Sequence, residues 1–147
     1  MYEILIVGGG PAGLTAAIYA ARAGKHVAVL ERGSTGGQII SAPLVENYPG
    51  LPSVSGAELA ARMAGQVRAL GAQILSAEAV GLEKTQAGFR VLCTDGVREA
   101  KAVILATGAA HRRLGLAAEE ALTGCGVSYC AVCDGAFYEG LDVAVVG

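Results

Sequence analysis

One segment near the start of the chain limits the fold more than any other: YEILIVGGGPAGLTAAIYAARAGKHVAVLE, residues 2–31. Its apolar run from Glu3 to Val7 predicts a strand covered on both faces, because buried parallel strands are nearly continuously apolar. After a glycine-rich turn, a helix is predicted from about Pro11 to Ala23, with apolar residues at helical spacing and Gly24 as C-terminal cap. A second apolar strand is predicted at Val27 to Glu31. Strand, helix and strand in this order predict a parallel βαβ unit and therefore an α/β, Rossmann-like fold.

The glycines of the turn form the pattern G-x-G-x-x-G at Gly8, Gly10 and Gly13. In this context the first glycine permits a tight turn, the second lets the backbone approach a pyrophosphate, and the third lets the helix pack close to the strand. The helix N-terminus offers N–H groups and partial positive charge to phosphates. Glu31 ends the second strand, where a carboxylate accepts hydrogen bonds from a ribose diol, and an acid there favours FAD or NAD over NADP. The turn predicts a dinucleotide site, with a ligand-free turn and a surface glutamate as the alternative.

The rest of the chain predicts a long loop, a second helix, further strands and a boundary. The turn-rich stretch from Gly33 to Pro52 is expected to contact a ligand, because long irregular segments in compact domains are usually functional. A boundary is expected in AHRRLGLAAEEALTG, residues 110–124, and GLDVAVVG, residues 140–147, predicts a strand that opens an incomplete repeat of the first one. The predicted helix runs from about Gly56 to Leu70 with Leu59, Met63, Val67 and Leu70 inward, and the predicted strands are Gln73 to Leu75, Phe89 to Thr94, Val97 to Ala100 and an apolar run within Lys101 to Ala109.

Composition and charge exclude several classes of function. The 147 residues carry a net charge of -2 without the basic stripe that binds nucleic-acid phosphates, so no nucleic-acid partner is predicted. The N-terminus has no cationic leader, and no stretch reaches the roughly 18 to 20 apolar residues of a membrane span, so we expect a cytoplasmic protein with no membrane partner. Four cysteines are too few for a disulfide-dense secreted scaffold, and in a reducing compartment a close pair more often serves catalysis or metal binding.

Cys130 and Cys133 lie three positions apart in VSYCAVCDGAFY, and this pair allows three interpretations. A zinc site lacks further ligands at a recognisable spacing, because Cys93, Cys125 and the histidines are scattered. A purely structural disulfide would close a very short loop and remove little entropy from the unfolded chain. A redox couple has the better physical basis, since one thiol of a vicinal pair attacks a disulfide and the other resolves the mixed intermediate.

The residues around the pair are less informative. Asp134 follows it directly and could transfer protons to and from a thiolate, although aspartate is also a common turn residue. Cys93 alternates with polar neighbours in a predicted strand and is expected to serve packing. Cys125 lies between two glycines and has no assigned role.

Taken together, these motifs resemble the bacterial, low-molecular-weight, FAD-containing thioredoxin reductases. GGGPAG (residues 8–13), GGQI (36–39), ENYPG (46–50), ILATGA (104–109) and CAVCDG (130–135) occur in family order and spacing over essentially the whole chain. Many flavoproteins share the first and fourth, whereas CxxC-D-G in this context is much more specific. The resemblance implies a path of electrons from NADPH to FAD, then to the Cys130–Cys133 disulfide, and then to the disulfide of thioredoxin or a related small dithiol protein.

The resemblance also assigns roles to individual residues. Cys133 becomes the sulfur nearer the isoalloxazine ring and Asp134 the acid/base, while the cysteine that first meets thioredoxin stays open. No metal site is predicted. The FAD-binding residues implied are Gly8, Gly10, Pro11, Ala12, Gly13, Glu31, Arg32, Gly33, Ser34, Thr35, Gly36, Gly37, Gln38, Asn47, Thr107 and Gly108.

A two-domain organisation follows from the same resemblance. Residues 1–112 are expected to form the N-terminal segment of an FAD-binding domain with a three-layer sandwich character. Residues 113–147 are expected to begin an NADPH-binding domain that carries the CxxC. The family holds these domains in alternating orientations, which places a hinge near His111 to Leu114, and it implies a homodimer. Because family members are longer, we expect this chain to be an N-terminal portion that is inactive with NADPH when isolated.

Two alternatives stay open. A flavoprotein subunit that reduces a peroxiredoxin resembles the same region but carries an added N-terminal thioredoxin-like region, which the sequence before Glu3 does not show. A non-catalytic FAD-binding module would use the dithiol as a redox sensor or docking element.

Overall fold

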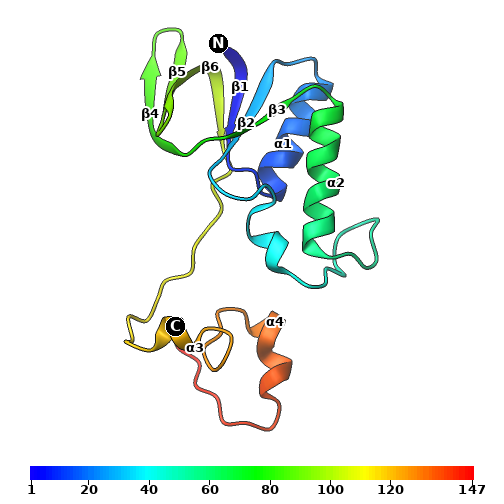
Figure 1. The fold of residues 1–147 in the computed structure, drawn as a ribbon, viewed down its shortest axis with the longest axis vertical. Helices are drawn as coiled ribbons and strands as arrows, with labels where there is room; N and C mark the ends of the chain where they lie inside the picture. The colour runs from blue at the N-terminus through cyan, green and yellow to red at the C-terminus, as the bar shows by residue number, and fades with distance from the viewer. The chain divides into compact units, whose positions relative to one another are not determined.

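The computed structural model describes residues 1–147 and divides them into two compact units, Met1–Gly108 and Ala109–Gly147 (Figure 1). The first unit holds a sheet and two long helices, and the second holds only short helical turns. In chain order the elements are β1 (Tyr2–Val7), α1 (Pro11–Arg22), β2 (Val27–Glu31), η1 (Gly37–Ser41), α2 (Gly56–Ala69), β3 (Gln73–Ser76), β4 (Ala79–Thr85), β5 (Gly88–Cys93), β6 (Gly96–Leu105), α3 (Glu119–Leu122), α4 (Ala131–Asp134) and η2 (Gly135–Tyr138).

The sheet of the first unit has six strands in the order β3-β2-β1-β6-β5-β4. β1 pairs in parallel with β2 and β6, and β2 pairs in parallel with β3, so the predicted βαβ unit is confirmed. β4, β5 and β6 form an antiparallel meander. β6 belongs to both parts, because Gly96–Ala100 pairs with β5 and Ala100–Leu105 pairs with β1.

Alternate residues of β1 enter two separate cores, which gives the unit three layers. Ile6 packs with α1 and α2 through Leu14, Leu59 and Val67. Leu5 points to the other face, where Ala28 and Leu30 of β2 meet Val91 and Cys93 of β5. Because strand side chains alternate between faces, one strand supplies both cores. The predicted α/β fold with a three-layer character is confirmed.

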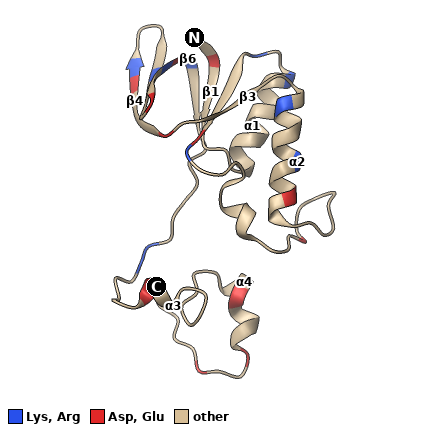
Figure 2. Ribbon diagram, in the orientation of Figure 1, with Lys and Arg blue, Asp and Glu red and all other residues tan.

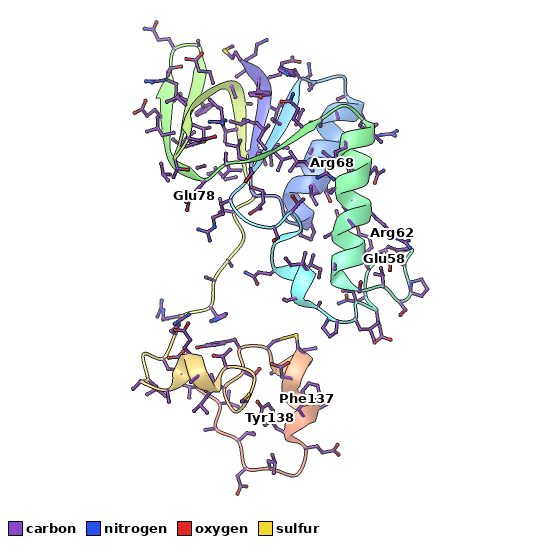
Figure 3. All side chains as sticks on the ribbon, viewed as in Figure 1. Glu58, Arg62, Arg68, Glu78, Phe137 and Tyr138 are labelled. Atoms are coloured by element: carbon purple, nitrogen blue, oxygen red, sulfur yellow. A yellow bond between two sulfur atoms is a disulfide. The ribbon has the colours of Figure 1, made fainter.

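The two long helices begin and end at residues suited to those positions. Pro11 occupies the first turn of α1, where its missing N–H is harmless, and Gly24 follows the helix with a φ of 71°. Ser55 caps α2 by accepting a hydrogen bond from the Glu58 amide at 3.1 Å. Glu58 lies in the first turn and Arg68 in the last, which suits the helix dipole (Figure 2). Glu58 also pairs with Arg62 one turn later, at 2.6 Å (Figure 3).

The second unit contains no buried hydrophobic residue. The buried apolar residues of the chain run from Leu5 to Ala100, and the one buried charged residue, Glu119, lies in the second unit. No helix in the structure combines the length and the apolar character needed to cross a membrane.

Four details of the predicted elements were wrong. Val97–Ala100 and the apolar run after it form one continuous strand, β6, because its first part pairs with β5 and its second part pairs with β1. The edge strand β4 was missed, since most of its residues are exposed and it lacks a clear apolar pattern. Residues 140–147 form no strand, because the second unit contains no strand to pair with them. Leu70 is 38% exposed and ends α2 instead of facing the core.

Candidate functional site

The glycine-rich turn fills the corner where β1, α1 and β6 meet. Gly8 has a φ of 108°, and a Cβ there would overlap the carbonyl oxygen of Ala106 at the end of β6. A Cβ on Gly13 would overlap the carbonyl oxygen of Gly8. The Gly8 amide donates to Leu30 O at 2.8 Å, which ties the turn to β2. Gly8 and Gly13 are therefore required by the packing of the protein itself, as the sequence predicted for a tight turn and close helix packing.

Gly10 differs from these two glycines because space in front of it is open. Its φ is -75°, and the nearest atom to an added Cβ would be Gly36 O at 3.9 Å. It occupies the N-cap of α1, and no side chain caps that helix. Pro11 and Ala12 are the first two residues of α1. The first turn of α1 has no side-chain cap, and its amides point toward the open space at Gly10. This arrangement fits a pyrophosphate.

Glu31 fastens the turn to the loop that follows β2. Its Oε2 accepts from the Gly9 amide at 2.7 Å, and its Oε1 accepts from the Gly33 amide at 2.8 Å. These bonds hold the carboxylate at the end of β2, beside the turn. A ribose diol recognised here would share acceptor oxygens that the backbone already orients.

A cleft of ≈ 190 Å³ lies at the carboxyl ends of these parallel strands. The ion pair between Arg32 and Glu78, at 3.6 Å, lies at this cleft, and Figure 3 labels Glu78 in the connection after β3. Val7, Gly8, Leu30, Glu31, Arg32, Ala77, Glu78, Ala79 and Thr107 line it. Since ligands of open α/β sheets bind outside the carboxyl ends of the strands, this cleft fits the nucleotide end of FAD.

Ala77, Glu78 and Ala79 were missed in the sequence. They follow β3, which lies next to β2. A signal did exist, because carboxyl ends of neighbouring parallel strands share one edge of a sheet, so the residues after Ser76 were candidates once β3 was predicted.

The loop after β2 runs alongside the glycine-rich turn. The Gly36 amide donates to Gly9 O at 2.8 Å, and a Cβ on Gly37 would lie 3.3 Å from Gly10 Cα. Ser34 O accepts from the Gly37 amide at 3.3 Å, which closes the turn between them. The predicted FAD-binding residues from Glu31 to Gly37 thus gather around Gly8–Gly10.

Four other predicted residues lie at different places. Thr107 lines the cleft, and Gly108 ends the first unit with a φ of 73°. Asn47 is exposed and does not line the cleft. Gln38 lies in η1, where its carbonyl accepts from Ser41 Oγ at 2.9 Å.

The cysteine pair of the second unit is closed as a disulfide. Cys130 and Cys133 are bonded, with Cα atoms 5.2 Å apart, across the start of α4. Cys130 Sγ accepts from the Cys133 amide at 3.2 Å, and Cys133 is exposed. The pair is thus reachable from solvent at Cys133, and an amide dipole points at Cys130 sulfur.

Asp134 is held beside the pair by Ser128. Ser128 Oγ donates to Asp134 Oδ2 at 2.6 Å and accepts from the Cys130 amide at 3.1 Å. One hydroxyl therefore links the predicted acid/base residue to the first cysteine of the motif. Ser128 was missed in the sequence, although a serine two residues before the N-cap of a short helix commonly makes such local bonds.

Glu119 organises the remainder of the second unit. Its carboxylate accepts from the amides of Leu114, Gly115 and Leu116 at 2.9, 2.7 and 3.2 Å, and from the Tyr129 hydroxyl. The Tyr129 hydroxyl, followed by these amides, lowers the pKa of Glu119 from 4.5 to about 2, and the same bond to Glu119 raises the pKa of Tyr129 above 10.0. The His111 ring stacks on Tyr129 at 3.6 Å between centroids. In the sequence, only a charged, alanine-rich segment marks the place of this cluster.

The other two cysteines have different surroundings. Cys93 is buried in the core between β1, β2 and β5, where burial raises the pKa of its thiol, in keeping with the predicted packing role. Cys125 is exposed.

Comparison with known proteins gives one family throughout the chain. Residues 2–147 match the family described as "Pyridine nucleotide-disulphide oxidoreductase". The thioredoxin reductase of Listeria monocytogenes is 43% identical over 147 residues, which are 100% of this chain and 46% of that protein. The crystal structure of thioredoxin reductase from Streptococcus pyogenes matches with 47% identity and a TM-score of 0.82, over 94% of this chain and 45% of that one. The Lactococcus lactis thioredoxin reductase in its FR conformation gives 42% identity and a TM-score of 0.80, over 94% and 46%. The chain thus spans about half the length of the relatives it matches.

Proposed function

This chain belongs to the pyridine nucleotide-disulphide oxidoreductase family, and from that premise we propose that it is the N-terminal portion of a thioredoxin reductase. In the proposed reaction, electrons from NADPH reduce the Cys130–Cys133 disulfide, and the dithiol reduces the disulfide of thioredoxin or a related small dithiol protein. The observation that carries the proposal is a solvent-accessible CxxC disulfide followed by a tethered aspartate, in a chain that also holds a dinucleotide turn.

The first unit is proposed to hold FAD, which supplies the hydride chemistry when it is bound. The amides around Gly10 and Ala12 would bind its pyrophosphate, because that helix start is uncapped. Glu31 would accept hydrogen bonds from a ribose diol, and the loop from Arg32 to Gln38, with Asn47, Thr107 and Gly108, would surround the rest.

At the dithiol, this chain's own residues exchange bonds with the partner. One thiolate of the pair attacks the thioredoxin disulfide, a mixed disulfide forms and a thioredoxin thiolate leaves. The second thiolate attacks the bonded cysteine, the Cys130–Cys133 bond forms again, and the second thioredoxin thiolate leaves. Two electrons pass to thioredoxin, and Asp134 is proposed to take up and release a proton beside the pair. Cys133 is proposed to be the sulfur nearer the flavin.

The proposal extends to the whole protein of which this chain spans a part. It includes a hinge near His111 to Leu114 between an FAD-binding domain, residues 1–112, and an NADPH-binding domain that begins at residue 113. It also includes a homodimer located in the cytoplasm and an isolated chain that is inactive with NADPH. These features are supported by the resemblance to thioredoxin reductases.

The partner is tested by trapping the mixed disulfide. Reduced Cys130→Ser and Cys133→Ser are each incubated with a thioredoxin whose resolving cysteine is changed to serine and whose attacking cysteine is activated as a mixed disulfide with thionitrobenzoate, and covalent adducts are identified by mass spectrometry. We expect an adduct with one of the two variants, because the resolving thiol is missing, and the same adduct when Cys125 is also changed to serine. Absence of an adduct with both variants, while thioredoxin reacts with dithiothreitol, contradicts the proposed function.

The cofactor is tested by visible absorption of the purified protein after incubation with FAD. We expect a yellow protein that dithionite bleaches and NADPH does not, because flavin absorption is lost on reduction and this chain spans about half of its relatives. Bleaching by NADPH alone contradicts the predicted inactivity of the isolated chain, and a colourless protein contradicts FAD binding by the first unit.

A further inference from the structure

Glu119 is the one buried charged residue of the protein, with 4% of its surface exposed. A carboxylate taken out of water needs hydrogen-bond donors, and Glu119 has three backbone amides and one phenol. This unit has no buried hydrophobic residue that would explain the burial of Glu119 by core packing. The carboxylate is therefore the centre of the local structure.

The donors to Glu119 come from two stretches that are apart in sequence. Leu114, Gly115 and Leu116 lie near the start of the second unit. Tyr129 directly precedes Cys130, and its ring is held on its other side by stacking on His111. Glu119 thus joins the beginning of the unit to the residue next to the redox pair.

The connection continues to the pair through the side chain of Ser128. Ser128 directly precedes Tyr129. The Ser128 hydroxyl accepts a hydrogen bond from the Cys130 amide and donates one to the Asp134 carboxylate. Restraining Tyr129 therefore restrains the backbone that sets the positions of Ser128 and Cys130. The chain from Ser128 to Asp134 has no apolar core of its own to provide this order.

We propose that Glu119 is a positioning residue for the redox pair, because its carboxylate ties Tyr129 to the Leu114–Leu116 segment and so holds Cys130 opposite Cys133. The proposal rests on the proposed function only in treating this disulfide as a working couple. Loss of the tie lets the Cys130 backbone move and lowers the effective concentration of the two thiols toward each other. The disulfide then becomes easier to reduce.

The measured quantity is the equilibrium of the pair with glutathione, in which two glutathione thiols reduce the disulfide and glutathione disulfide forms. The 147-residue protein carrying Cys125→Ser is equilibrated at graded ratios of reduced to oxidised glutathione, quenched and alkylated. Mass spectrometry then gives the reduced fraction. Neither thioredoxin nor FAD takes part, so a failure here is distinct from a failure to trap thioredoxin.

Two test variants and one control variant distinguish loss of the Glu119–Tyr129 tie from loss of a nearby negative charge. Tyr129→Phe removes the phenol donor and keeps the ring beside His111. Glu119→Gln removes the charge and replaces one carboxylate oxygen with an NH2 group, which is itself a donor and faces the backbone amide donors. The control, Glu120→Gln, removes a neighbouring charge whose contact is an exposed ion pair with Arg113 at 3.2 Å.

We expect Tyr129→Phe and Glu119→Gln to lower the glutathione equilibrium constant for disulfide formation about fivefold, or about 20 mV, with no change in Glu120→Gln. Unchanged constants in both test variants overturn the proposal. So does an equal shift in Glu120→Gln, which would indicate net charge alone. If Glu119→Gln unfolds the second unit and Tyr129→Phe leaves the constant unchanged, Glu119 supports the fold only and the proposal also fails.

Discussion

The two units of this protein reach order by different means. The first unit contains the buried apolar residues, arranged in two cores on opposite faces of one sheet. The second unit contains a buried carboxylate, a disulfide between cysteines three positions apart and local hydrogen bonds, but no buried apolar side chain. Because apolar burial contributes most of the free energy of folding, the first unit should withstand changes of pH and redox state that disturb the second.

This difference matches the roles proposed for the two units. A cofactor scaffold needs a rigid strand edge, and the cleft lies at the ends of β1 and β2, which have buried residues on both faces. A redox pair that exchanges bonds with a partner needs exposure, and Cys133 is exposed. Polar contacts can hold such a site in place without covering it.

The largest effect is expected from a cavity in the core of the first unit. Leu5→Ala removes a side chain with 0% exposure at the centre of the sheet. We expect the free energy of unfolding of that unit to fall by about 2 to 5 kcal/mol, because a cavity adds to the lost transfer free energy. Guanidinium unfolding followed by circular dichroism measures it, and Leu82→Ala, at a 44% exposed position, is the control. Equal losses in both variants contradict the two-core description.

The next expected effect is on the second unit, through pH. Folding lowers the pKa of Glu119 from 4.5 to about 2, so its contribution to stability is complete above 4.5 and is lost as pH falls toward 2. Folding raises the pKa of Tyr129, so that contribution is present below 10.0 and is lost as pH rises beyond it. We expect the Tyr129 ring resonances in NMR spectra to lose their dispersion below about pH 4, while those of Tyr2 stay dispersed. In Glu119→Gln the acid transition of Tyr129 should disappear, and its persistence would argue against this assignment.

A smaller effect is expected when the open space at the glycine-rich turn is filled. Gly10→Ala meets no protein atom closer than 3.9 Å and needs no left-handed backbone, so the fold should stay intact. Its methyl group would occupy the surface offered to pyrophosphate, and we expect FAD or ADP binding to weaken about tenfold or more. Gly65→Ala, in the middle of α2 with open space around it, should leave affinity unchanged. Isothermal titration calorimetry compares the three proteins, and equal affinities would remove the phosphate role of Gly10.

The smallest effect is expected at the α2 cap. Ser55→Ala removes the acceptor of the Glu58 amide and should lower the free energy of unfolding by about 1 kcal/mol. Ser55→Asp, which restores an acceptor, should recover most of this loss. Thermal unfolding that shows no difference between alanine and aspartate would mean that the cap contributes nothing to the first unit.

Local patterns predicted the first unit well and the second one poorly. The strand, turn and helix from Tyr2 to Glu31 follow from apolar spacing and glycine positions, which depend on neighbours in sequence. β4 was missed because its order comes from pairing with β5 and not from its own pattern. Residues 140–147 carry a strand pattern without a partner strand, so pattern alone gave the wrong result.

The same limit applies to the site. Gly8, Gly13 and Glu31 lie where the motif predicts, since the turn is local. The contacts of Glu119 with Tyr129 join residues ten positions apart through side chains, and no periodicity records such a contact. Asn47 was carried over from the resemblance, and its role in binding FAD stays a prediction.

The most direct test of the central claim is electron transfer from this dithiol to thioredoxin. The protein is reduced with dithiothreitol, freed of reductant and mixed in excess with oxidised thioredoxin, and the thiols of each protein are counted by alkylation and mass spectrometry. The account predicts that thioredoxin gains two thiols as the Cys130–Cys133 disulfide forms again, with the same result in Cys125→Ser and none in Cys130→Ser/Cys133→Ser. Thioredoxin that stays oxidised, while glutathione disulfide readily oxidises the same dithiol, would contradict the account.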